Sequence, residues 1–152
     1  MGDVVNLYEV ATERDTADPP EFRGGMARLG PRLGAKALGA TVYDLDPGHS
    51  ICPYHYENVE EEWLLVLDGT PVLRDPEGEH ELAVGDLVHF PVGPDGAHKV
   101  TNRSEAPVRV AMFSTVPPVS ICVYPDSDKV LVNPPGKVFC LADAVDYFAG
   151  EI

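Results

Sequence analysis

The sequence has few cysteines, few basic residues and no long hydrophobic run. Its three cysteines are Cys52, Cys122 and Cys140, and they form no C-x-x-C pair. Disulfide-stabilised domains carry more cysteines, usually in even number, so reduced thiols in a cytoplasmic protein are expected. No apolar run reaches the ~18 residues that suggest a membrane span, and the first residues lack the basic and apolar regions of a signal peptide. We therefore expect no membrane partner.

Positive charge is also scarce. The 152 residues include 25 acidic and 11 basic side chains, which gives a formal net charge of −14. A nucleic-acid backbone is bound by a basic face, so this balance argues against a nucleic-acid partner. Hydrophobic residues make up 44% of the chain, enough for the core of one domain of this length.

Glycine and proline recur at short intervals, and the segments between them are rich in Val, Leu, Ile and aromatic residues. This pattern is typical of an all-β sandwich or barrel. The expected strands lie at residues 37–45, 50–57, 61–68, 70–74, 79–84, 86–91, 97–102, 107–115 and 119–124.

The chain divides into three expected parts. Residues 1–35 are polar and contain Pro and Gly, which predicts an N-terminal arm. Residues 36–125 carry the strands of the barrel, and residues 126–152 form a C-terminal extension. The apolar spacing of Leu141, Val145 and Phe148 predicts a short helix in this extension.

The stretch "YHYENVEEEW", residues 54–63, is either part of a metal site or a charged patch on a strand. Period-two alternation places His55 and Glu57 on one face of their strand and Cys52 on the other. A turn then brings Glu62 in from the next strand. A fourth donor, His98, opens a strand after a Gly-rich turn.

The spacing of these residues resembles the two motifs of the cupin superfamily. The first motif reads Gly48, six residues, His55-x-Glu57, four residues, Glu62, six residues, Gly69. The second reads Gly85, five residues, Pro91-Val92-Gly93, four residues, His98, three residues, Asn102. The whole chain is similar to small single-domain bacterial cupins, most of which lack an assigned reaction.

The resemblance implies a double-stranded β-helix with a small cavity open at one end. It also implies a divalent metal, one of Mn, Fe, Ni or Zn, held by His55, Glu57, Glu62 and His98. Glu57 stands where the family has the second histidine of His-x-His, so the expected set has two imidazoles and two carboxylates. Without metal, the two carboxylates should repel, and one should hold its proton with a raised pKa. Cupins commonly pair through edge strands, so a homodimer is expected.

Three functions remain open at this level. The first is a metal-dependent enzyme acting on a small molecule, either an oxygenase or an isomerase or lyase. The second is a non-catalytic module that binds a sugar or small acid. The third is a metal-free barrel in which Glu57 and Glu62 pair with Arg74, Lys99 or Arg103. The sequence designates no catalytic base distinct from the ligands. His89 is a candidate for substrate contact, and His49 and His80 are expected to be ordinary surface or packed residues.

Overall fold

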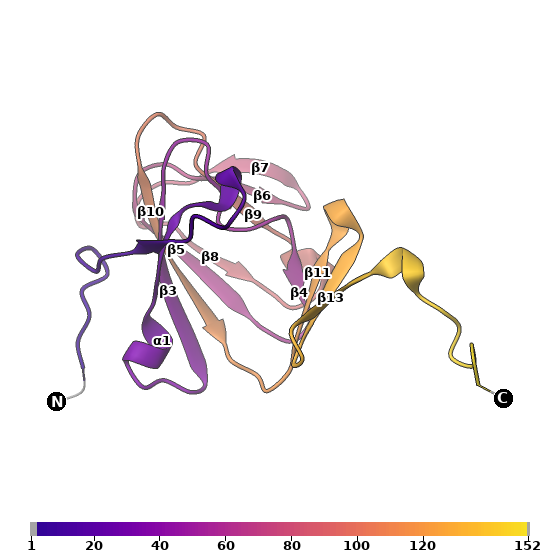
Figure 1. Cartoon of the computed structure of the whole chain (residues 1–152). Coiled ribbons are helices and arrows are strands. Elements are labelled where there is room, and N and C mark those ends of the chain that lie inside the picture. The colour runs from indigo at the N-terminus through magenta and orange to yellow at the C-terminus, as the bar shows by residue number, and fades with distance from the viewer. Residues whose placement is uncertain (1–2, 152) are drawn as a thin grey trace.

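The computed structural model describes residues 3–151 and shows an all-β barrel (Figure 1). Antiparallel pairing joins the strands into sheets of six, four and three. The six-stranded sheet has the order β1 (Glu13–Arg14), β2 (Gly25–Arg28), β3 (Leu38–Leu45), β10 (Val108–Thr115), β5 (Glu62–Asp68) and β8 (Leu87–Phe90). The four-stranded sheet has the order β13 (Lys137–Cys140), β12 (Lys129–Asn133), β11 (Ser120–Tyr124) and β4 (Tyr56–Glu57). The three-stranded sheet has the order β7 (Gly78–Glu81), β6 (Val72–Asp75) and β9 (Lys99–Thr101).

Helical structure is limited to short pieces between strands. One four-residue α-helix, α1 (Leu29–Arg32), follows β2. The 3-10 turns are η1 (Pro20–Phe22), η2 (Pro94–Gly96), η3 (Pro125–Ser127) and η4 (Leu141–Asp143). No helix among residues 3–151 has the length and apolar character needed to cross a membrane.

The long sheet separates two hydrophobic clusters because side chains alternate between its faces. Leu45, Val110 and Leu64 belong to the cluster inside the barrel. Val42 and Ala111 belong to a second cluster on the outer face, where the N-terminal segment covers the sheet. The middle of β10 is therefore covered on both faces, which explains the consecutive buried residues Val110, Ala111 and Met112.

The strand predictions agree with the structure, except at residues 50–57. There only β4 and isolated bridges at Ser50 and His55 form, because the chain bends at residues 51–54 around Pro53. Four strands were not predicted: β1 and β2 in the N-terminal segment, and β12 and β13 in the C-terminal one.

Arg109 attaches the N-terminal segment to the barrel. Its guanidinium lies 3.2 Å from Asp44 and donates to the backbone carbonyls of Leu7 (3.0 Å) and Val10. The segment is therefore held to the sheet by a partly buried cation as well as by β2. A partly buried, charge-assisted contact of this kind is stronger than an exposed ion pair.

Two residues of the motifs, Gly69 and Asn102, have structural roles. Gly69 has φ +78°, and a Cβ there would lie 2.9 Å from the backbone oxygen of Pro107, so a side chain would be strained. Asn102 is fully buried and donates to the carbonyls of Leu45 and Ala106, each at 2.8 Å. These motif residues hold turns between strands and are absent from the cavity lining.

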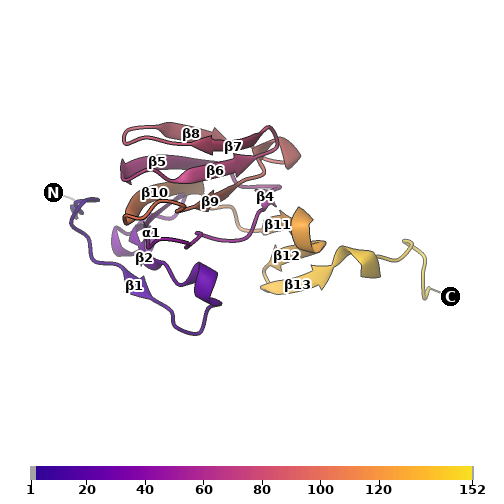
Figure 2. The same ribbon diagram turned by 90° about the horizontal axis from the view of Figure 1, so that it is seen from above.

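The helix predicted over residues 141–150 is wrong. Only the three-residue η4 forms, and the chain beyond it extends away from the barrel (Figure 2). Val145 and Phe148 are 76% and 75% exposed, so their predicted apolar face is not buried against residues 3–151. A helix of about ten residues without a packing surface is marginal in water, which accounts for the difference.

The homodimer stays a prediction, and the extended C-terminal segment offers a surface for it. Sedimentation of the wild type should give twice 16.4 kDa at micromolar concentration. Replacing both Tyr147 and Phe148, which are 89% and 75% exposed, by Ser should shift the equilibrium toward monomer. The matched control is Val4→Ser, which removes an 80% exposed apolar side chain at the other end of the chain. A wild-type monomer would contradict the dimer, and a dimeric double variant would move the interface elsewhere.

Candidate metal centre

Two histidines distant in sequence lie on adjacent segments of backbone. The backbone of His55 donates to the carbonyl of His98 at 3.1 Å, and His98 donates back at 2.8 Å. This isolated antiparallel bridge brings the two imidazole rings to a centroid distance of 4.5 Å. Both residues are buried, at 7% and 2% exposure. The two sequence motifs therefore meet at this pair.

Each ring is oriented by a hydrogen bond from its Nδ1 atom. Nδ1 of His98 lies 2.9 Å from the carbonyl oxygen of Gly96, and Nδ1 of His55 lies 3.0 Å from that of Pro53. A carbonyl only accepts, so both Nδ1 atoms carry protons and donate. The Nε2 atoms are left to face the cavity. Phe90 holds the His98 ring further by stacking on it at 3.7 Å.

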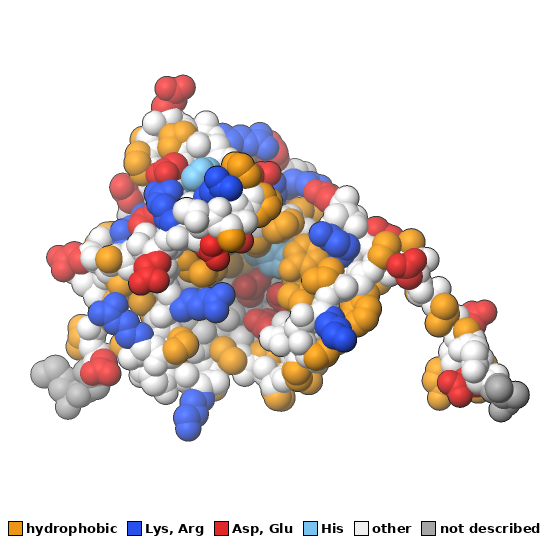
Figure 3. All heavy atoms as spheres, in the orientation of Figure 1, with side chains coloured by type: hydrophobic (Ala, Val, Ile, Leu, Met, Phe, Trp, Pro, Cys, Tyr) orange, Lys and Arg blue, Asp and Glu red, His pale blue; other side chains and the backbone are white. Residues whose placement is uncertain are grey.

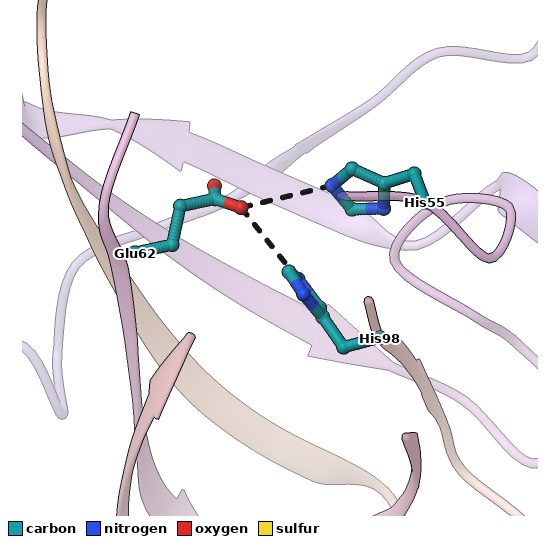
Figure 4. A group of neighbouring side chains, drawn as sticks. All are labelled: His55, Glu62 and His98. Carbon is teal, nitrogen blue, oxygen red and sulfur yellow. Dashed lines mark ion pairs between the residues drawn. The ribbon is translucent and has the colours of Figure 1, made fainter. Parts of the chain in front are cut away.

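Glu62 supplies the third group from the first position of β5. Its Oε2 atom lies 3.7 Å from Nε2 of His55 and 3.6 Å from Nε2 of His98 (Figure 4). The side chain points into the barrel because Glu62, Leu64 and Val66 alternate inward along the strand.

The three groups line a cavity of about 200 Å³ inside the barrel. Figure 3 shows histidine atoms at the bottom of a hollow, with acidic side chains beside them. The remaining walls are largely apolar and come from Met26, Tyr43, Ile51, Cys52, Val100 and Met112. No lysine or arginine lines this cavity among the described residues.

The two histidines differ in protonation. Burial, assisted by the neighbouring His55, lowers the pKa of His98 to about 4, so its ring stays neutral. Burial also opposes charge on His55, but the sulfur of Cys52 and the carboxylate of Glu62 outweigh it and raise the pKa to about 11. The pocket thus favours a positive charge between His55 and Glu62.

These residues fit a divalent cation. Oε2 of Glu62 and Nε2 of His98 are buried and have no hydrogen-bond partner in the described chain. One donor atom from each of His55, Glu62 and His98 lies within 4.8 Å of the others. A neutral imidazole whose Nδ1–H is bonded to a carbonyl presents Nε2 as a ligand, which is the usual arrangement around metal-binding histidines. The three side chains could therefore hold a metal and leave coordination positions open.

Glu57, the fourth expected ligand, lies apart from this group. Its carboxylate gathers with Cys122 and His55, within 4.8 Å of one another, and its Oε2 atom is buried without a partner. The pKa of Glu57 is raised, as expected for one of two inward carboxylates. Burial is the main cause, and repulsion from Glu60 and Glu62 is a smaller one.

Cys52 and Tyr43 line the cavity, although alternation placed Cys52 on the opposite face from His55. The prediction for Cys52 is wrong because bends at residues 51–54 break the strand period, and its Sγ lies 3.4 Å from Nδ1 of His55. Tyr43 was not selected from the sequence. Its inward position on β3 is visible only once β2 and β3 are paired.

The other candidate side chains lie outside the cavity. His89 lies on the outer surface, where its ring is tilted by 49° against Trp63 and its Nε2 is 3.1 Å from Glu61, and His80 pairs with Asp75. The cations considered as partners of the inward carboxylates are engaged elsewhere, in the pairs Arg74–Asp126, Lys99–Glu21 and Arg103–Glu79. The metal-free pairing with these residues is therefore not observed.

Comparison with known families agrees with this geometry. The model of the family described as "Cupin domain" matches residues 41–116, half of the chain. The chain belongs to the cupin family. The matched range contains both motifs, so the small cupin and its double-stranded β-helix, expected from their spacing, are confirmed.

Several solved cupin-like structures share the fold. A candidate sugar phosphate isomerase from Acidithiobacillus ferrooxidans is 23% identical, with a TM-score of 0.82, and the match covers 92% of this chain and 91% of that one. A sugar phosphate isomerase of the cupin superfamily from Silicibacter pomeroyi is 24% identical, with a TM-score of 0.82 and coverage of 95% and 98%. A candidate oxalate decarboxylase from Thermotoga maritima is 22% identical, with a TM-score of 0.62 and coverage of 76% and 100%. No match is found among curated proteins.

The first site prediction concerns the donors. His98→Ala and Glu62→Gln should each lower the affinity for Mn²⁺, Fe²⁺, Ni²⁺ or Zn²⁺ by about 100-fold or more, because changes even to groups behind the ligands cost 10–100-fold. His80→Ala, on the outer surface, should leave affinity unchanged. The measurement is metal content after dialysis, together with titration calorimetry. Equal metal content in the His98 and His80 variants would remove His98 from the site.

The second site prediction concerns Glu57 in the chelator-treated protein. Its pKa is raised in the folded state, so the unfolded chain ionises first and stability is lost as pH rises from about 4 through the folded pKa. Glu57→Gln cannot ionise and should escape this loss. Urea unfolding at several pH values should therefore show the variant gaining stability relative to wild type as pH rises. A difference that is independent of pH would contradict the raised pKa.

Proposed function

We propose that this protein is a metal-dependent enzyme that isomerises or cleaves a small, oxygen-rich molecule inside the barrel. The observation that carries the proposal is the convergence of two buried Nε2 atoms on one carboxylate oxygen of Glu62, at 3.6 and 3.7 Å. Each Nδ1 proton is held by a backbone carbonyl, so the neutral His98 ring presents the lone pair of Nε2 to the cavity. His55 would present its own Nε2 lone pair after losing the proton that its raised pKa retains, because metal binding displaces such protons. His55, Glu62 and His98 would hold the metal.

When bound there, the metal would act as a Lewis acid on a carbonyl or carboxylate oxygen of the substrate. Imidazole and carboxylate donors suit Mn, Fe, Ni and Zn. Three protein ligands leave open positions for substrate oxygen. Glu57 stays outside the ligand group in this proposal, in contrast to the four-ligand set expected from the motif.

The cavity walls would position the substrate and its protons. Burial raises the pKa of Tyr43 to about 12, so this hydroxyl keeps its proton and can donate a hydrogen bond to a substrate oxygen. The apolar walls, which include Ile51, Val100 and Met112, would exclude water around the reacting carbons. A cavity of about 200 Å³ is below the ~300 Å³ at which typical ligand pockets begin, which favours a small substrate.

The structural neighbours support a sugar-like substrate. The two structures named as sugar phosphate isomerases cover 92% and 95% of this chain, so the likeness extends beyond the barrel into both terminal segments. The candidate oxalate decarboxylase covers 76%. We therefore propose a sugar-like substrate for this chain. The carbonyl of a sugar could bind the metal, its oxygens could accept a hydrogen bond from Tyr43, and a small sugar suits the volume of the cavity.

An oxygenase is the second candidate. Two histidines and one carboxylate with open positions form the ligand set of many non-haem iron(II) oxygenases. The same three donors could therefore serve oxygen chemistry if the resident metal is iron.

Hydrogen exchange tests the proposed reaction directly. Metal-loaded protein is mixed with aldoses, ketoses and their phosphates in D2O, and NMR follows deuterium entering the carbon next to the carbonyl. Wild type should catalyse exchange and interconversion with one of them, and Glu62→Gln should lose about 100-fold or more. Glu61→Gln changes an exposed neighbouring carboxylate and should retain activity. Oxygen consumption by the iron-loaded protein without exchange would favour the oxygenase. Ligand binding without either reaction would overturn the enzyme and leave a binding module.

A further inference from the structure

Arg28 lies on the face of β2 that turns toward the metal cavity. In the pairing of β2 with β3, Met26 stands opposite Tyr43 and Arg28 opposite Thr41. Met26 and Tyr43 line the cavity. Positions two apart share a face of a strand, so Arg28 and Thr41 belong to the same inner face, one step further toward the sheet's end.

The strand register also places Arg28 at the same end of the sheet as Glu62. Arg28 pairs with Thr41, Thr41 with Met112 and Met112 with Leu64, so these four residues form one row across the sheet. Glu62 lies two residues before Leu64 on β5 and therefore belongs to the next row on the same face. Strands β5 and β2 are separated by three steps along the sheet, which is about 14 Å at ~4.8 Å a step. Two long side chains that converge from these positions leave room for one molecule of sugar size.

The charge of Arg28 is available to a ligand. Five of the chain's cations form ion pairs, at Arg14, Arg74, Lys99, Arg103 and Arg109, and Arg28 forms none with any described residue. Its side chain is exposed. Its positive charge nevertheless acts on a residue of the cavity wall. Burial raises the pKa of the Tyr43 hydroxyl, and the charge of Arg28 opposes this rise.

The space beside Arg28 is continuous with the cavity wall. A groove of about 730 Å³ runs along β2, and its charged lining residues are Arg14, Arg28 and Arg32 together with Glu13 and Asp15. Met26 lies in the wall of both the groove and the metal cavity. A substrate held at the metal could therefore extend past Met26 toward a guanidinium.

We propose that Arg28 is a specificity residue that binds a phosphate or carboxylate group of the substrate at the cavity mouth. The inference rests on the proposed function, because it assigns the other end of the same molecule to the metal. A guanidinium offers several donors in a planar fork that matches the oxygens of either group. The protein should then prefer a small sugar-like molecule with an oxyanion at the end remote from its carbonyl.

Three ligands with one carbon skeleton test the assignment: D-glucose, D-glucose 6-phosphate and D-glucuronate, which carry a hydroxyl, a phosphate ester and a carboxylate at the last carbon. Titration calorimetry on the metal-loaded full chain should show at least one anionic ligand binding about tenfold or more tightly than glucose. Arg28→Gln should remove this preference without changing metal content or glucose binding, and Arg28→Lys should keep part of it. The phosphate and carboxylate arms show which oxyanion is selected.

The matched control is Lys36→Gln, which removes an equal charge from an exposed position between α1 and β3 that lines neither the groove nor the cavity. It should keep the preference. Equal losses in both variants, or an unchanged preference in Arg28→Gln, would overturn the assignment, as would no binding of either anionic ligand at millimolar concentration. Metal content is measured separately. An Arg28-dependent preference in a protein that binds no metal would overturn the proposed function and leave the assignment standing.

Discussion

The paired backbone hydrogen bonds between His55 and His98 are the contact on which the rest of the site depends. The two residues belong to motifs 43 positions apart, and neither lies within a regular strand. A hydrogen-bonded antiparallel pair fixes the distance between its two Cα atoms at about 5.5 Å. The two rings are therefore neighbours before any metal enters. Each ring is then oriented by a carbonyl two residues earlier in its own chain segment, Pro53 or Gly96. The orientation of each ring therefore depends on residues near it in the sequence. Only the backbone bridge between His55 and His98 joins the two distant segments.

Glu62 completes the group, and its backbone lies in a regular strand, unlike the backbones of the two histidines. It begins β5, which pairs with β10 on one side and β8 on the other, so its backbone is held by the rigid sheet. The histidines come from bends and turns that the sheet borders. Burial places the carboxylate next to two imidazoles with no hydrogen bond to satisfy its Oε2 atom. An unpaired buried carboxylate oxygen is costly, and a cation at this point would remove the cost. The same arrangement that destabilises the metal-free chain thus favours metal binding.

The sequence predicted the strands and the His55, Glu62 and His98 grouping because these depend on spacing. Turn glycines set strand ends, and period two sets the inward face. It could not place Cys52, because this residue lies in the bends at residues 51–54, where alternation stops applying. Nor could it choose between helix and extended chain after residue 141, since apolar spacing says nothing of whether a packing surface exists. Tyr43 and Arg28 follow from strand register, which a single sequence does not specify.

The strongly acidic composition does not oppose an anionic ligand at the cavity. Charges separated by more than about 8 Å are largely screened at physiological ionic strength, so the net charge of −14 acts mainly on solubility and association. What a ligand meets at the mouth is set by the few groups within that distance. In the buried cavity the protonated His55 and the carboxylate of Glu62 offset each other, and a bound divalent ion would make the floor positive. Glu57 lies beside His55 and adds negative charge where it is ionised. Along β2 the charged residue on the inner face is Arg28, and Glu13 of β1 stands opposite Met26 on that same face. A chain that is acidic overall can therefore still offer an anionic ligand two local attractive charges, at Arg28 and at a bound metal ion, while Glu13 opposes binding of an oxyanion beside Met26.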